Sequence, residues 1–428
     1  MKTSPRSPPL NRLRNLLQSI GPGVVTGASD DDPSGIGTYA MAGASFGYAT
    51  LWTAWLTFPL MASIQFTCAK IGMVSGKGIA GVLRDHYPRP LLYIIVASLM
   101  VANTLNAGAD ILAIAAGINL LIPIPLWTLI IPIGLTIVGI QIVGSYQVIA
   151  NIFKWLTLSL FTYIGAAFLA KPDWSEVLLK TFSPSIQFDN AFLMILVAIL
   201  GTTISPYLFF WQANQEVEEE IAKGRTHLSQ RKGATKAELS HARWDVIIGM
   251  LLSNIVMYFI ILATAATLHQ AGRTDINSAA DAAEALRPLA GDAATWLMAI
   301  GLIGTGFLAV PILTGSAAYA VCEIFGWPCS LDAKARQAKE FYITLTLCTL
   351  GALLIDFVGI NPMDALLWTA VVNGLLAPPL LVLIMLMANN RAVMGEHVGG
   401  VLINVLGWLT TALMAAAAVG LFVTSGKS

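Results

Sequence analysis

Long apolar stretches alternate with short polar segments along almost the whole chain. A helix needs about 20 apolar residues to cross the hydrocarbon core of a bilayer, so stretches of this length predict membrane-spanning helices. Eleven such stretches can be placed, and the first and sixth are longer than one crossing and interrupted by proline. They lie at roughly 15–46, 49–73, 91–121, 126–146, 148–170, 190–222, 244–268, 293–321, 341–358, 364–388 and 401–424. The pattern therefore predicts an all-α membrane protein.

Lysine and arginine are distributed unequally between alternate connecting segments. If the N-terminus lies inside, the inner segments carry 19 of the 24 basic residues. Cytoplasmic loops are enriched in these residues, so the bias predicts a cytoplasmic N-terminus and an outer C-terminus in the cell inner (plasma) membrane. Residues 1–14 are expected to form a cytoplasmic tail, and 15–425 a single transmembrane domain. The longest inner segment, 213–243, begins with an acidic run and is expected to be a solvated extension of the sixth helix.

Composition supports the membrane class and excludes several others. Hydrophobic residues make up 56% of the chain and charged residues only 11%, against about a quarter in soluble domains. The formal net charge of zero argues against a nucleic-acid partner. The four cysteines lack Cys-x-x-Cys spacing and are expected to be small apolar residues, not a disulfide pair or a zinc site.

Three consecutive aspartates interrupt the first apolar stretch. Asp30, Asp31 and Asp32 precede Pro33 at mid-membrane depth, where each charged residue costs roughly 2.5–3.5 kcal/mol. Proline removes a backbone donor, so the helix is expected to unwind here and to free carbonyl oxygens. No Lys or Arg lies in any predicted span at the same depth. A bound cation is the simplest countercharge, and Asp32, beside the proline, is the strongest candidate ligand, followed by Asp31.

The sixth stretch is interrupted in the same way, at Ser205-Pro206-Tyr207. Two interrupted helices at corresponding positions of two five-helix halves indicate an inverted-repeat transporter with a site at the membrane midplane. We expect the first repeat over about 15–170, the second over about 190–388, and an accessory eleventh helix at 401–424.

The residue types near the breaks narrow the expected ion. All five histidines fall in loops or at helix ends, and neither break contains a cysteine or methionine. Carboxylate, carbonyl and hydroxyl oxygens favour hard cations such as Mg²⁺, Mn²⁺ or Ca²⁺. Small residues such as Ser34, Gly35 and Ser205 leave room for retained water, which suits Mg²⁺.

The chain resembles the Nramp family of divalent metal ion transporters. Gly21-Pro22-Gly23 followed by Asp32-Pro33-Ser34-Gly35 is similar to the first helix of that family, in which Asp-Pro-Gly-Asn follows Gly-Pro-Gly. Gln65 to Gly76 and Asn119-Leu120-Leu121 resemble its second and third helices, and Ser205-Pro206-Tyr207 stands where the family carries Met-Pro-His. The altered pair of motifs is closest to the Nramp-related magnesium transporter branch. The resemblance implies a LeuT-like fold for residues 15–425.

The resemblance also implies a set of site residues. The ligating aspartate corresponds to Asp32, and the family's Asn and Met correspond to Gly35 and Ser205. The two ligating backbone carbonyls correspond to Ser29 and Thr202. The secondary candidates are Asp31, Tyr207 and Asp110. Tyr207 stands in place of the family's His, and Asp110 stands where the family carries a glutamate on the third helix. Asp110 with Asn103 and Asn106 could line a polar path or form a helix–helix hydrogen-bond cluster, and both interpretations stay open.

These observations predict a secondary transporter that imports Mg²⁺ and/or Mn²⁺ as substrate, with no cofactor. A proton-coupled Mn²⁺/Fe²⁺ symporter of the ordinary Nramp type is the main alternative, and an organic-solute carrier on the same fold is less favoured. Protons therefore stay open as a co-substrate, and a monomer is expected. An enzyme is not predicted, because the sequence contains no His-Glu-x-x-His, no P-loop and no plausible Ser–His pair.

Overall fold

The computed structural model describes residues 21–143, 158–331, 333–357 and 359–426. All regular structure in these ranges is helical. By length and composition, seven helical stretches of the described residues could cross a membrane: Arg89–Leu121, Leu126–Val143, Asn190–Ala222, Lys236–His269, Ala279–Phe325, Pro362–Asn389 and Val401–Ser425. The prediction of an all-helical membrane protein is therefore confirmed, while the count of eleven crossings stays a prediction.

Both proline-interrupted stretches are broken in the structure. The first consists of α2 (Pro22–Asp30) and α3 (Pro33–Phe46), and the second of α11 (Asn190–Thr203) and α12 (Pro206–Ala222). In each case proline occupies the first position of the resumed helix, where its missing N–H is tolerated. Each helix is interrupted by two residues, although the N–H of Ile204 still bonds to the carbonyl of Leu200 and the carbonyl of Asp32 accepts from the N–H of Ile36.

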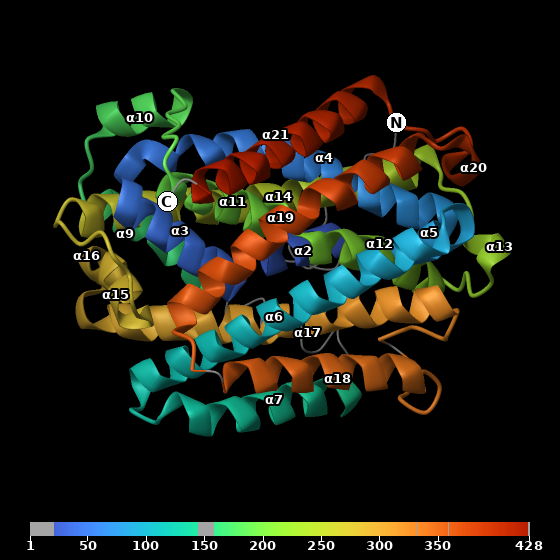
Figure 1. Ribbon diagram of the computed structural model, residues 1–428, viewed down its shortest axis with the longest axis horizontal. Coiled ribbons are helices and arrows are strands. Elements are labelled where there is room, and N and C mark those ends of the chain that lie inside the picture. The colour runs from blue at the N-terminus through green and yellow to red at the C-terminus, as the bar shows by residue number, and fades with distance from the viewer. Residues whose placement is uncertain (1–20, 144–157, 332, 358, 427–428) are drawn as a thin grey trace, which may run out of the picture.

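The broken helices lie in the middle of the bundle, between longer unbroken ones (Figure 1). Helix α6 (Arg89–Leu121) packs along α17 (Ala294–Phe325) and α19 (Pro362–Asn389). Beyond them, α7 (Leu126–Val143) and α18 (Lys339–Asp356) lie side by side at the lower edge of the view. The arrangement buries the breaks under several layers of apolar side chain.

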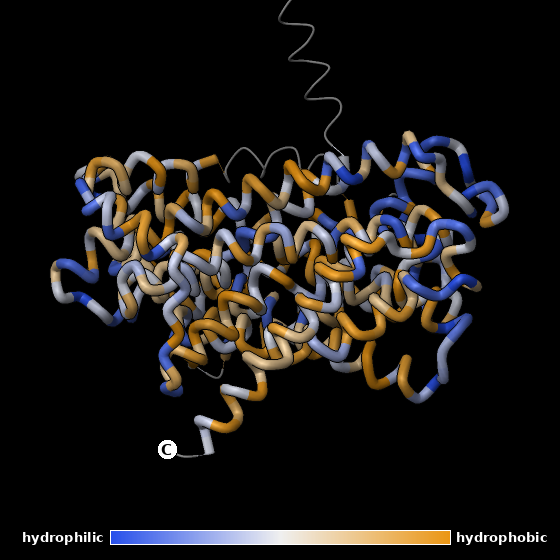
Figure 2. The backbone as a smooth tube through the Cα atoms, turned by 90° about the horizontal axis from the view of Figure 1, so that it is seen from above, coloured by the Kyte–Doolittle hydropathy of each residue, from blue (hydrophilic) through white to orange (hydrophobic). Residues whose placement is uncertain are grey.

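The remaining helices complete the bundle and cover its ends. The long ones are α4 (Trp52–Ser75), α14 (Lys236–Thr264), which continues as a π-helix (Ala265–His269), and α21 (Val401–Ser425). At one end of Figure 1 lie α5 (Ile79–His86), α13 (Leu228–Arg231) and α20 (Arg391–Met394), and at the other α10 (Trp174–Phe182), α15 (Ala279–Ala283) and α16 (Arg287–Ala290). Hydrophilic residues are concentrated at these two ends, as a membrane protein requires (Figure 2).

Several predicted segments fall partly or wholly outside the described residues, among them the start of the first expected span (15–46) and the end of the fourth (126–146). The expected span at 148–170 is described only from Leu158, as a short 3₁₀ turn (Leu158–Phe161) followed by α9 (Thr162–Leu169). The expected cytoplasmic tail, 1–14, lies outside the described ranges. All four cysteines lie within them as free thiols, and Cys68, Cys322 and Cys348 are buried.

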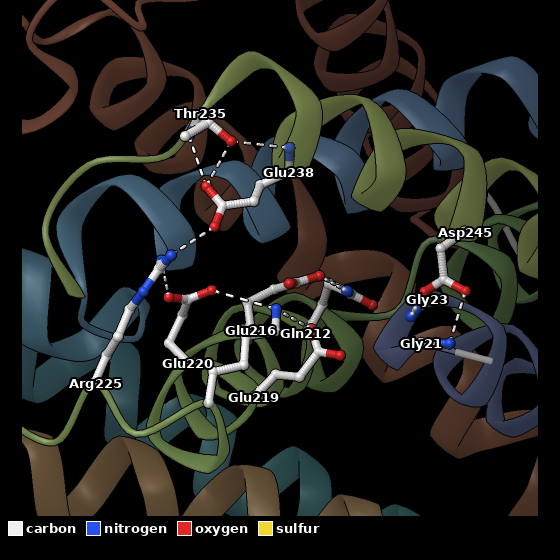
Figure 3. A network of polar contacts seen from close by, with 11 residues as sticks. Gly21, Gly23, Gln212, Glu216, Glu219, Glu220, Arg225, Thr235, Glu238 and Asp245 are labelled. Atoms are coloured by element: carbon white, nitrogen blue, oxygen red, sulfur yellow. Dashed lines mark hydrogen bonds and ion pairs between the residues drawn. The ribbon is translucent and has the colours of Figure 1, made fainter. Parts of the chain in front are cut away.

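A close approach between two backbones fixes the first half-helix. A Cβ placed on Gly27 of α2 would stand 2.3 Å from the carbonyl oxygen of Gly249 on α14, so only glycine allows this contact. At the start of α2, the carboxylate of Asp245 accepts hydrogen bonds from the backbone N–H groups of Gly21 (3.0 Å) and Gly23 (2.6 Å) (Figure 3). Helix α14 therefore sets the position of the chain that leads into the acidic turn.

The acidic run after the sixth stretch differs from the expectation. It does extend α12 to Ala222, but Glu216 and Glu220 are only 3% exposed, so the prediction of a solvated extension is wrong for these two residues. Glu216 accepts a hydrogen bond from Gln212 (2.9 Å), and Glu220 pairs with Arg225 (Figure 3). The short connection after α12 folds back and brings its basic residues onto the run, a contact that local sequence cannot indicate.

Candidate metal site at the two broken helices

The carboxylate of Asp32 lies where the first helix resumes after its break. Its backbone is extended, and its side chain caps α3 by accepting a hydrogen bond from the backbone N–H of Gly35 (2.8 Å). The hydroxyl of Ser34 donates to the same oxygen, Oδ1, over 2.7 Å. Asp is a preferred N-cap residue and proline a preferred first helical residue, so the local sequence favours this conformation.

Two other helices contribute donors to the second oxygen of Asp32. The side-chain amide of Asn106 on α6 donates to Oδ2 over 3.2 Å, and the hydroxyl of Tyr207 on α12 lies 3.4 Å away. Tyr207 also donates to the backbone carbonyl of Ser29 over 3.0 Å, its shorter contact. Asp32 is 1% exposed, so four helical segments converge on one buried carboxylate.

The second break meets the first through small side chains. The hydroxyl of Ser205 donates to the carbonyl of its own helix at Thr202 (2.6 Å) and reaches that of Gly201 (3.0 Å). The hydroxyl of Thr202 lies 3.5 Å from that of Ser34. A Cβ on Gly35 would stand 3.2 Å from the Thr202 hydroxyl, so glycine is the residue that lets the two breaks approach this closely.

Most of the predicted site residues meet at this point. The structure gathers Ser29, Asp32, Gly35, Thr202, Ser205 and Tyr207 around the two breaks. Asp31 does not join them, because its carboxylate lies 3.2 Å from Ser253 on α14. Asp110 is buried on α6 toward the backbone of Ser34, without a hydrogen bond of regular geometry.

Two asparagines on α6 make hydrogen bonds to other helical segments. Asn106 donates to Asp32, and Asn103 donates to the backbone carbonyl of Leu313 on α17 over 2.9 Å. Both contacts join α6 to a neighbouring segment, and a polar path along α6 stays a prediction.

The donor set is one of oxygens only. Among the described residues, no group of three or more His, Cys, Asp or Glu side chains is placed to hold a metal ion. Around Asp32 the two breaks offer one carboxylate together with backbone carbonyls, hydroxyls and an amide. Such a set suits a hard cation that keeps part of its water, rather than a soft ion held by sulfur or imidazole.

The sequence does not single out two serines that contact the acidic turn. Ser34 is indicated only by its small size, although its hydroxyl bonds to Asp32. Ser253 is not indicated, and it is the partner of both Asp30 (2.6 Å) and Asp31. In the sequence, Ser253 and Asn254 are only two polar residues inside an apolar stretch. The packing of α14 against the acidic turn is what brings Ser253 to the aspartates.

A buried carboxylate at the meeting point of two broken helices, inside a bundle of apolar helices, defines an ion-binding membrane transporter. The chain belongs to the Nramp family: residues 23–424 match the family described as natural resistance-associated macrophage protein-like. The resemblance stated from the first and sixth helices is thereby confirmed.

Proteins of known name align with nearly the whole chain. The divalent metal cation transporter MntH of Caldanaerobacter subterraneus subsp. tengcongensis is 25% identical over 405 residues, which span 94% of this chain and 92% of the relative. Among solved structures, a manganese transporter of Eremococcus coleocola aligns with a TM-score of 0.71 at 19% identity, over 99% of this chain and 89% of that one. The structure of MhsT in complex with L-phenylalanine aligns with a TM-score of 0.58 at 13% identity, over 94% and 97%.

The family also answers two of the broader expectations. Its named relatives are metal transporters, so the prediction that this chain is not an enzyme is confirmed. In such a protein the metal is transported substrate, which agrees with the expectation that no cofactor is needed. The likeness to MhsT and to the manganese transporter shows that the chain has a LeuT-like fold.

Proposed function

We propose that this chain is a secondary transporter of divalent metal ions, with Mg²⁺ and Mn²⁺ as substrates. The buried carboxylate of Asp32 carries the proposal. This acid lies between α2 and α3, the two halves of the first helix, and α6 and α12 also reach it. A carboxylate at this depth requires either hydrogen-bond donors or a cation. The ion binds to Asp32 and to the carbonyls of Ser29 and Thr202, with retained water filling the rest of its shell.

Neutral oxygens around the second break support Mg²⁺ as a substrate. Ser205 presents a hydroxyl where the family resemblance expects a sulfur, and Gly35 presents no side chain at all. A site without a soft ligand loses preference for Mn²⁺ and Fe²⁺ over harder ions. The space that glycine and serine leave suits an ion that gives up water reluctantly.

A proton-coupled Mn²⁺/Fe²⁺ symporter is the second candidate function. Two relatives are described as MntH and as a manganese transporter, which favours Mn²⁺. Asp110 is buried beside the site and supplies a carboxylate that could carry the proton. Against this, Tyr207 replaces the family's histidine, and Ala107 replaces its other third-helix acid, so we favour transport without proton coupling.

An organic solute is disfavoured by the acidic turn. MhsT shows that a similar fold can accompany a bound amino acid. Amino-acid sites direct half-helix N-termini toward a carboxylate, and three aspartates at the break would repel that group.

The topology that accompanies the proposal follows from the sequence. We infer eleven crossings arranged as two inverted five-helix repeats, 15–170 and 190–388, with the eleventh helix as an accessory. The N-terminus is cytoplasmic, by the distribution of Lys and Arg, and the protein acts as a monomer in the plasma membrane. An inside-negative potential draws divalent cations inward, which supports uptake.

Metal flux into proteoliposomes tests the proposal. Parallel uptake of Mg²⁺ and Mn²⁺ is measured with a pH-sensitive dye inside the vesicles. We expect both ions to enter without acidification, and we expect Asp32→Ala to abolish entry of both. Full activity of Asp32→Ala would disprove the site, and acidification coupled to entry would establish the symporter instead.

A further inference from the structure

Asp30 and Asp31 lie on the opposite side of the turn from the partners of Asp32. Their carboxylates face Ser253 on α14, whose hydroxyl lies 2.6 Å from Asp30 Oδ2 and 3.2 Å from Asp31 Oδ1. The exposed fractions of the two aspartates are 0% and 5%. They are therefore too deeply buried to serve as an acidic entrance that gathers cations from solution, which is the other role an acidic run could have.

The hydrogen bonds available to these two carboxylates are too few. A serine hydroxyl has a single hydrogen, so Ser253 can donate to only one of them at a time. Asp30 Oδ1 is buried and has no hydrogen-bond partner among the described residues. Asp32, by contrast, accepts hydrogen bonds from the side chains of Ser34 and Asn106 and from the backbone N–H of Gly35, and the hydroxyl of Tyr207 lies 3.4 Å away. The ion pairs of the described part of the chain all involve other residues, so no Lys or Arg compensates the two acids.

An independent oxygen lies next to the same turn. The phenol of Tyr39 on α3 is fully buried, and its hydroxyl makes no hydrogen bond of regular geometry. Its ring edge and the carbonyl of Asp30 both approach Gly35, within 3.3 and 3.4 Å of where a Cβ would stand. The Tyr39 side chain therefore packs against the acidic turn, where its hydroxyl and Asp30 Oδ1 are both buried without a hydrogen-bond partner among the described residues.

We propose that Asp30, Asp31 and Ser253 form a second binding site for a divalent cation, separate from the one at Asp32. Two carboxylates neutralise a divalent charge, and carboxylate and hydroxyl oxygens are ligands that hard cations prefer. The choice of a divalent ion rests on the proposed function, whereas the existence of a separate site does not. Because ions on one continuous turn repel each other strongly in a medium of low dielectric constant, the sites fill in turn and not together.

Binding of Mn²⁺ alone to purified full-length protein tests this site. The background is Asp32→Ala, which removes the ligand of the transport site. We expect that protein to retain saturable Mn²⁺ binding by equilibrium dialysis. Adding Asp30→Asn and Asp31→Asn abolishes the remaining binding, and adding Ser253→Ala weakens it about tenfold, as loss of an orienting partner does.

A matched control separates loss of the site from loss of the fold. Asp356 on α18 is another buried carboxylate without a hydrogen bond. Adding Asp356→Asn to Asp32→Ala is expected to leave Mn²⁺ binding unchanged, and metal-free thermal unfolding confirms that each variant folds. If folded Asp32→Ala binds no Mn²⁺, or if its binding survives the two asparagine substitutions, the second site does not exist.

The same proteins distinguish failure of this inference from failure of the proposed function. With native Asp32, the Asp30→Asn, Asp31→Asn protein should still bind Mn²⁺. If it binds none while Asp32→Ala does, the ion is held by Asp30 and Asp31 and the proposed transport site at Asp32 is wrong. If it binds Mn²⁺ while Asp32→Ala binds none, the transport site stands alone and the second site is disproved.

Discussion

The two broken helices have the same backbone arrangement and opposite chemistry. In both, two residues separate the end of the first half from the proline at which the second half begins. The first break carries three buried carboxylates, which accept hydrogen bonds from α6, α12 and α14 as well as from the start of α3. The second carries no charge, and the hydroxyl of Ser205 donates to carbonyls of its own helix. One break therefore depends on its surroundings for charge compensation, while the other is satisfied locally.

This difference assigns separate tasks to the two breaks. A buried charge costs several kcal/mol unless it is paired, so the first break decides whether a cation binds at all. The second break contributes neutral oxygens and space, which decide how strongly one cation is preferred over another. Substitutions at the first break should change affinity for every metal, and substitutions at the second should change the ratio between metals.

The largest expected effect follows from removing the charge of Asp32. Asparagine is also a good N-cap residue, so Asp32→Asn preserves the start of α3 and removes only the anionic ligand. We expect the affinity for Mg²⁺ and Mn²⁺ at the transport site to fall by more than the roughly 10- to 100-fold that loss of an outer partner costs. Radiotracer uptake over a range of metal concentrations measures the loss. Asp356→Asn is the control and should transport normally, whereas normal uptake by Asp32→Asn would show that this charge is not required.

Replacing a glycine at which a half-helix touches a neighbouring backbone should lower the free energy of unfolding substantially. A Cβ on Gly27 would meet the backbone of Gly249 at 2.3 Å, and one on Gly201 would meet the carbonyl of Ala370 on α19 at 2.1 Å. We expect Gly27→Ala and Gly201→Ala each to destabilise the fold by about 1–3 kcal/mol, as overpacking does.

Thermal unfolding in detergent measures both variants beside Gly139→Ala. A Cβ on Gly139 of α7 meets nothing within 4 Å, so this substitution should leave the unfolding temperature unchanged or raise it slightly. Equal stability of all three proteins would show that the half-helices are not held by backbone contact. A loss confined to one half-helix would reveal that the two breaks are supported differently.

Substitution of Ser205 at the uncharged second break should change the preference between Mn²⁺ and Mg²⁺. Ser205→Met places a thioether where Ser205 now donates to Thr202, and a soft ligand favours Mn²⁺ over Mg²⁺. We expect the Mn²⁺/Mg²⁺ uptake ratio to rise about tenfold, a difference of about 1.4 kcal/mol in binding. Ser205→Leu has similar bulk without sulfur and controls for the loss of space. An unchanged ratio in Ser205→Met would mean that this side chain does not contact the ion.

Local signals predicted the parts of the site that depend on local sequence. Prolines and charges inside apolar stretches indicated both breaks and singled out Asp32, because helix interruption and buried charge are readable within a few residues. Contacts between distant helices were not readable in this way. Tyr207 reaches the Ser29 carbonyl across 178 positions, and Ser253 reaches Asp30 across 223.

The same limit explains where the expectation failed. A run of glutamates after a membrane helix is normally solvated, and nothing near Glu216 and Glu220 in sequence indicates that they are buried. Their burial results from the tight connection after α12 and its packing on α14, which brings Arg225 to both Glu220 and Glu238 (Figure 3).

The smallest effect is expected from changing Tyr207, which follows the second break and contacts both Ser29 and Asp32 at the first. Tyr207 donates to the Ser29 carbonyl, a proposed ligand, and lies near Asp32 Oδ2. Its hydroxyl therefore competes with the metal for both oxygens. A hydrogen bond contributes about 0.5–1.5 kcal/mol net, so we expect Tyr207→Phe to tighten metal binding by roughly two- to tenfold without changing the Mn²⁺/Mg²⁺ ratio.

Equilibrium dialysis with each metal measures that change. Tyr163→Phe is a suitable control, since Tyr163 on α9 is buried and its hydroxyl contacts the sulfur of Met298, away from either break. Weaker binding in Tyr207→Phe would mean that the phenol is a ligand or an essential orienting group, not a competitor. In that case the second break would contribute to affinity for every metal, and the division of tasks between the two breaks would no longer hold.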